Sequence, residues 1–116
     1  MTKAQKDRMD RFLSSVGGYC VVFGLTNYDV VVRAIDEPGY HAMLDCDSDN
    51  CTAVFYYNYV EDETPEETAL HEVLHLLLAR YRDLARYRFV DERSLDVAEE
   101  SIVRTLSKIF TNLKLL

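Results

Sequence analysis

Apolar positions recur along the first part of the chain with the spacing of an α-helix. Apolar side chains every three or four residues predict a helix that ends at Gly17-Gly18, because glycine is a common stop signal for helices. Thr2 and Gln5 have the spacing of a capping box, in which each side chain accepts a hydrogen bond from the other residue's backbone N–H. We therefore expect the chain to begin with a capped amphipathic helix.

Four runs of apolar, β-branched and aromatic residues follow, each bounded by residues typical of turns. They span residues 19–25, 30–35, 41–45 and 52–60. Val, Ile, Tyr and Phe fit the pleated surface of a sheet, whereas the Gly, Pro, Asn and Asp residues between the runs favour turns. Strands joined by short turns run antiparallel. The pattern predicts a mainly antiparallel sheet of about four strands.

The pattern returns to helical spacing in the second half of the chain. Thr64, Pro65 and Glu67 form a helix start signal, with Thr at the N-cap, Pro at the first helical position and Glu three residues after the cap. A broad apolar stripe continues to about residue 88, and a break near residues 89–93 precedes a last helix over roughly 94–113. The order of elements predicts an α+β fold, a single domain over residues 1–116 with an N-terminal helix, a sheet and two C-terminal helices.

Composition narrows the class of protein. The chain has 116 residues, of which 48% are hydrophobic and 28% charged, as in an ordinary globular domain. A net charge of −7 disfavours nucleic-acid binding, because phosphate backbones would be repelled. No apolar run approaches the ~20 residues that cross a bilayer, and the N-terminus lacks a secretory signal. We therefore expect a cytoplasmic protein with no membrane partner.

The cysteines agree with that expectation. There are three, Cys20, Cys46 and Cys51, and an odd number without a secretion signal argues against a disulfide framework. Cys46 and Cys51 flank a turn and could face each other across a hairpin, but reduced thiols are the favoured interpretation.

The helix predicted to begin at Thr64-Pro65 contains a motif of possible metal ligands. Residues 71–75 read His-Glu-Val-Leu-His. Residues four apart share one face of a helix, so the imidazoles of His71 and His75 can reach one zinc ion at about 2 Å each. Glu72 then lies beside the metal, where it can accept a proton from water. The competing interpretation is a helix that carries two surface histidines, which the surrounding helix signals disfavour.

A catalytic zinc site needs a third protein ligand, and the best candidates lie on the last helix. Glu99 falls on the apolar stripe of that helix, four residues after Leu95 and three before Ile102. An unpaired carboxylate on such a face would be costly. Glu100 is turned away from the stripe toward Arg104 and is expected to be solvated. Periodicity therefore favours Glu99 over Glu100 as the ligand, and the alternative role for Glu99 is that of a buried partner for an arginine.

Two further features lie on the predicted third strand. Asp45 begins a stretch similar to the start of a calcium loop, but the twelfth position of that loop is Tyr56 where an EF-hand needs a bidentate Glu. His41 lies on the predicted third strand, before the motif, and we expect it to be structural or exposed.

The motif followed by a Glu on a later helix resembles the gluzincin type of zincin, in which a sheet precedes the active-site helix. The order is similar to small metallopeptidase-like proteins of phages and prophages, and more distantly to the metallopeptidase domain of ImmA/IrrE-type regulators. Two positions depart from the ImmA/IrrE pattern: Leu74 replaces the Gly that usually precedes the second His, and Ile102 replaces an Ala after the Glu ligand.

The resemblance implies both a site and a substrate class. It implies a zinc ion held by His71, His75 and Glu99, with Glu72 as the general base of peptide hydrolysis. It also implies that the strand nearest the cleft, over residues 52–60 or its neighbour, pairs with an extended peptide. The leading hypothesis is thus a zinc metallopeptidase that acts on a peptide or protein.

Two other functions stay open at this point. A zincin-fold protein with weak or no catalysis could act as a binding or regulatory module, because 116 residues leave little wall around a substrate cleft. A proteolytic regulator of one dedicated partner is also possible, and such a protein would be inert toward generic substrates.

Overall fold

A computed structural model gives the arrangement of the chain and describes residues 1–36, 38–86 and 91–113. The elements are α1 (Lys3–Val22), β1 (Asp29–Ala34), β2 (Ala42–Asp47), β3 (Thr52–Tyr57), α2 (Pro65–Arg86) and α3 (Glu92–Leu113). The predicted α+β order is confirmed, with three strands in the described residues where about four were expected. The predicted end of α2 near residue 88 lies outside these residues.

The first helix begins as predicted and ends later than predicted. Thr2 and Gln5 form the capping box, with Thr2 Oγ1 accepting from the Gln5 N–H at 3.1 Å and Gln5 Oε1 accepting from the Thr2 N–H at 2.9 Å. The helix then passes through the two glycines that were expected to end it, and the predicted strand over residues 19–25 was wrong. Gly24, with φ of 71°, follows its last turn.

Burial explains why the helix continues. Phe12, Val16 and Cys20 are spaced four residues apart and are all buried. A longer helix therefore extends one buried face. Two mid-helix glycines cost roughly 1 kcal/mol each relative to alanine, and burial of this face offsets that cost.

The sheet is mixed, in contrast to the mainly antiparallel sheet that was predicted. The strand order is β1-β3-β2, with β1 parallel and β2 antiparallel to the central strand β3. Short connections do join successive strands, but β1 and β2 do not pair with each other. The chain turns back after β2, and β3 lies between the two earlier strands. β2 is therefore an edge strand, and β3 has partners on both sides.

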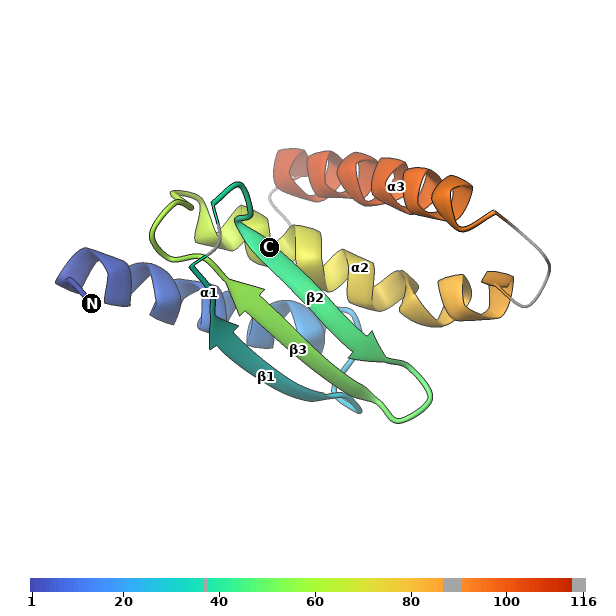
Figure 1. Cartoon of the computed structure of the whole chain (residues 1–116), viewed down its shortest axis with the longest axis horizontal. Helices are drawn as coiled ribbons and strands as arrows, with labels where there is room; N and C mark the ends of the chain where they lie inside the picture. The colour runs from blue at the N-terminus through green and yellow to red at the C-terminus, as the bar shows by residue number, and fades with distance from the viewer. Residues whose placement is uncertain (37, 87–90, 114–116) are drawn as a thin grey trace.

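The helices cover one face of this sheet. Figure 1 shows the sheet lying over α1 and α2, with α3 alongside α2. The main core joins α1, β3 and α2, and its members include Phe12, Phe55, Tyr57, Val73 and Leu76. Within the part of the chain that the structure describes, no helix combines the length and apolar character needed to cross a bilayer.

The last helix is attached by a much smaller apolar cluster. Leu70 and Leu74 of α2 pack against Val103, which is the buried residue of α3. Partly buried side chains complete this cluster, among them Leu106 and Phe110. Much of the remaining contact between α2 and α3 is polar, and it contains the predicted site.

The cysteines are free thiols in the structure. Cys46 on β2 lies opposite Ala53 on β3, so the hairpin register does not place it opposite Cys51. Cys51 itself adopts a positive φ of 54° in the turn.

Candidate metal centre

The two histidines of the motif lie one helical turn apart on α2. Their ring centroids are 5.0 Å apart, with an interplanar angle of 67°. Val73, Leu74 and Leu76, which lie between and beside them, are at most 1% exposed. Because these apolar side chains anchor α2 in the two cores, the histidines are turned toward α3 and the rim of the sheet.

Glu100 of α3 lies between the two imidazoles. Its Oε1 is 2.8 Å from His71 Nε2, and its Oε2 is 3.0 Å from His75 Nε2. One ligand atom from each of these three residues lies within 4.8 Å of the others. The geometry thus brings together His71, His75 and Glu100, each half-buried, as a group that could hold a metal ion.

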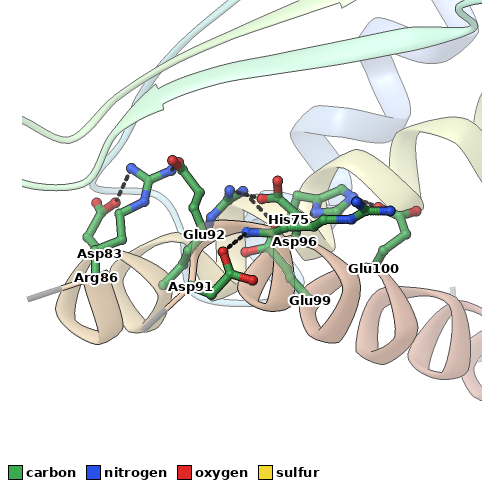
Figure 2. Close-up of polar contacts among 10 residues, drawn as sticks. His75, Asp83, Arg86, Asp91, Glu92, Asp96, Glu99 and Glu100 are labelled. Atoms are coloured by element: carbon green, nitrogen blue, oxygen red, sulfur yellow. Dashed lines mark hydrogen bonds and ion pairs between the residues drawn. The ribbon is translucent and has the colours of Figure 1, made fainter. Parts of the chain in front are cut away.

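Glu99 contacts the other nitrogen of His75. Its Oε2 lies 2.7 Å from His75 Nδ1 (Figure 2). The side chain of Glu99 is 11% exposed, compared with 35% for Glu100. Arg82 Nη1 lies 3.5 Å from the same carboxylate oxygen. Glu99 is therefore inward-facing, as its position on the stripe predicted, but the cluster that fits a metal contains Glu100 in its place.

The packing of α3 on α2 explains the difference. The predicted stripe passed through Ile102, which is 43% exposed, whereas Val103 is fully buried. The buried line of α3 is thus shifted by one residue, and Glu99 and Glu100 lie four and three residues before Val103. Both carboxylates consequently flank the buried line and face α2.

Because α2 and α3 run antiparallel, the first residues of α3 lie beside the end of α2, and later residues of α3 lie beside the histidines. Arg86 of α2 contacts Glu92, Arg82 contacts Asp96, and the motif histidines contact the later glutamates. The sequence predicts surface pairs for Arg82 with Asp83, Asp91 or Glu92. In the structure its partners are Asp96 and Glu99 of α3, which only the packing of the two helices brings within reach.

Glu72 is buried and lines the same region. Burial, against the opposing charge of His75 and with smaller contributions from the charges of Glu100 and Glu99, raises the pKa of its carboxyl group to about 7. Burial lowers the pKa of His75, but the hydrogen bond with Glu99 and the nearby carboxylates outweigh it, so that this pKa is raised. The pKa of His71 is lowered, mainly by burial, against the opposing charge of Glu100.

Two adjoining hollows meet at this cluster. One, of about 480 Å³, lies between β2, α2 and α3 and extends along Leu44 and Cys46 to Arg86. The other, of about 680 Å³, is bordered by His41 and His71. Both are lined by Tyr40, Ala42, Glu72, His75 and Glu100. The strand expected beside the cleft, over residues 52–60, is the central β3, and its neighbour β2 is the strand that lines the hollow.

His41 is exposed, as expected, and has a buried partner that the sequence did not indicate. Its Nδ1 lies 3.4 Å from Oδ1 of Asp62, which is fully buried. The same Oδ1 accepts from the Thr64 N–H at 3.3 Å, just before the first turn of α2. Asp62 thus helps to fix the start of the helix that carries the motif.

The donor set fits zinc. Two imidazole nitrogens and one carboxylate are common ligands of catalytic zinc, and three protein ligands leave a fourth position for water or substrate. The three groups come from two helices and converge on one point beside a hollow.

Comparisons with protein-family models, with curated proteins and with solved structures found no match to this chain.

Proposed function

We propose that this protein is a zinc-dependent peptidase in which His71, His75 and Glu100 hold the metal and Glu72 is the general base. The observation that carries the proposal is the convergence of both motif histidines on a carboxylate from a separate helix. Two histidines on a helix surface would not require such a partner.

The residues have separable roles. When bound, zinc would polarise the carbonyl group of the substrate and make a water molecule more acidic. Glu72 lines both hollows, where its carboxylate accepts the proton of the attacking water and then donates it to the leaving amine.

The edge strand offers a way to hold a peptide. β2 pairs with β3 on one side and lines the hollow beside His75 and Glu72. Unpaired backbone groups of an edge strand can hydrogen-bond an extended peptide. We therefore assign β2, and not β3, as the strand that binds substrate next to the catalytic group.

Metal content tests the proposal directly. The protein purified without added metal, and then titrated with zinc, should bind one equivalent per chain. Glu100→Ala should weaken zinc binding by more than about 100-fold, because loss of a direct ligand exceeds the 10–100-fold typical of an outer-sphere partner. Glu63→Ala is the control, since Glu63 is exposed and lines neither hollow. Unchanged zinc affinity in Glu100→Ala would contradict the ligand assignment.

Hydrolysis is tested separately with the zinc-loaded protein. Casein and a mixed peptide library serve as substrates, with products identified by mass spectrometry. Cleavage abolished by a chelator and restored by zinc supports the peptidase. Zinc binding without cleavage of any peptide would favour the alternative of a metal-containing binding or regulatory module.

A further inference from the structure

His75 makes contacts through both ring nitrogens, each with a different carboxylate of α3. Nε2 lies 3.0 Å from Glu100, and Nδ1 lies 2.7 Å from Glu99. An imidazole that ligates a metal through Nε2 is neutral and carries its proton on Nδ1. That proton needs an acceptor, and the orientation of the ring depends on where the acceptor lies.

His71 provides an internal comparison. Its Nε2 contacts Glu100 at 2.8 Å, as does that of His75. Within residues 1–36, 38–86 and 91–113, the ion pair of His71 with Glu100 is made through Nε2, and no second carboxylate pairs with the ring of His71. The two histidines thus share the same carboxylate through Nε2 and differ at Nδ1, where only His75 has an acidic acceptor among the described residues.

Glu99 is itself held in place. Its side chain is 11% exposed, and Arg82 Nη1 lies 3.5 Å from the oxygen that contacts His75. Arg82 also forms an ion pair with Asp96, one turn earlier on α3. The carboxylate therefore has restricted freedom, which a group that fixes the orientation of a ligand requires.

We propose that Glu99 is a positioning residue: it accepts the Nδ1 proton of His75 and aims Nε2 at the point where His71 and Glu100 converge. The inference rests on the proposed function, because it takes His75 as a metal ligand. It changes the role of Glu99 from ligand to the orienting group of a ligand. Arg82 completes the arrangement by holding the carboxylate of Glu99.

Zinc affinity separates this role from that of a ligand. Each variant is loaded with zinc in competition with a chromophoric chelator. Glu99→Ala should still bind one zinc per chain, with affinity lowered about 10–100-fold. Glu99→Gln keeps an oxygen that can accept the Nδ1 proton and should recover most of that loss. Glu92→Ala is the matched control, because this exposed carboxylate lies two turns earlier on α3 and pairs with Arg86.

Cobalt supplies a second measurement that does not depend on activity. The visible absorption bands of the cobalt-substituted protein report the coordination geometry. They should shift in Glu99→Ala and stay close to wild type in Glu99→Gln and Glu92→Ala. Glu99→Gln preserves size and hydrogen bonding and provides a folded variant if the alanine variant does not fold. In that case Arg82→Gln, which removes the group that holds the carboxylate of Glu99, takes the place of Glu99→Ala in the comparison.

The outcomes distinguish this inference from the proposed function. Zinc affinity in Glu99→Ala equal to that in Glu92→Ala would overturn the positioning role. Complete loss of zinc in Glu99→Ala together with full retention in Glu100→Ala would make Glu99 the ligand and would also overturn it. If Glu99→Ala behaves as expected but no form of the protein cleaves peptides, the peptidase proposal fails and the positioning role stands.

Discussion

The ring of Phe12 in α1 lies parallel to the ring of Tyr57 in β3, with centroids 4.0 Å apart and planes 9° from parallel. Both side chains are fully buried. Stacked aromatic rings of this kind contribute beyond their buried area. This contact joins the first helix to the central strand and thereby supports the sheet on which α2 and the metal cluster are placed.

Truncation of this stack should be among the most damaging changes to stability. We predict that Phe12→Ala lowers the free energy of unfolding by about 3–5 kcal/mol, because it leaves a cavity in the main core. The neighbouring Leu13→Ala should change it by less than about 1 kcal/mol, since Leu13 is 52% exposed. Urea unfolding of both variants measures the difference. Equal effects at the two positions would contradict the assigned packing of α1.

Glu72 can be tested without disturbing the ligands. We predict that Glu72→Gln binds zinc with nearly wild-type affinity and loses about 10²–10⁴-fold in the rate of peptide hydrolysis, because a neutral amide cannot accept a proton from water. The measurement is the initial rate on any peptide that the wild-type protein cleaves, with zinc content determined on the same samples. Glu63→Gln serves as the control, because Glu63 is exposed and lines neither hollow. Full activity in Glu72→Gln would refute the assignment of the base.

The ion pair between Arg11 and Glu66 should make stability depend on pH. Arg11 Nε lies 2.7 Å from Glu66 Oε1, and Nη2 lies 2.9 Å from Oε2, which joins α1 to the first turn of α2. The hydrogen bond from Arg11 lowers the pKa of Glu66 below its usual value of 4.5. The stabilising contribution is therefore present above about pH 4.5 and is lost as the pH falls through the lowered value.

The exposure of the Arg11 and Glu66 side chains limits the size of this effect. Both side chains are nearly half exposed, so solvent screens the pair and its contribution to the free energy of unfolding should be small. Glu66→Gln should be less stable than wild type at pH 7, and the two should converge once the pH falls below the lowered pKa of Glu66. Asp10→Asn is the matched control, because it removes an exposed carboxylate from the helix that carries Arg11 and leaves the Arg11–Glu66 pair intact. Thermal melts across the pH range provide the measurement, and a constant gap between Glu66→Gln and wild type would contradict the predicted linkage.

Zinc should stabilise the attachment of α3 in particular. α3 supplies Glu100 to the cluster, and Val103 is its one buried residue in the described part of the helix. A ligand that bridges α2 and α3 in the folded state stabilises that state by about 2.7 kcal/mol at 100 times its dissociation constant. We predict that zinc slows amide exchange in α3 more than in α1.

Hydrogen exchange with mass spectrometry gives this comparison for each helix. The Glu100→Ala variant should show no zinc-dependent change in α3. Equal protection of α1 and α3 by zinc would indicate general stabilisation and would contradict a bridging site.

Local sequence signals by themselves determined where two of the helices begin and that the two histidines share a helix face. The Thr2–Gln5 capping box forms where the sequence predicts it, and α2 begins at Pro65 after Thr64. The adjacency of His71 and His75 also follows from sequence alone, because residues four apart on any α-helix share a face. These features involve neighbours in the chain, so short-range geometry is sufficient to predict them.

Contacts between distant elements decided the rest. The extension of α1 past its glycines depended on burial against β3 and α2, and the mixed sheet depended on β3 entering between β1 and β2. The choice between Glu99 and Glu100 depended on Val103, and not Ile102, becoming the buried residue of α3. One residue turns a helix by about 100°, so periodicity can place two adjacent carboxylates near a face, but only the packing of α3 on α2 sets which nitrogen each one meets.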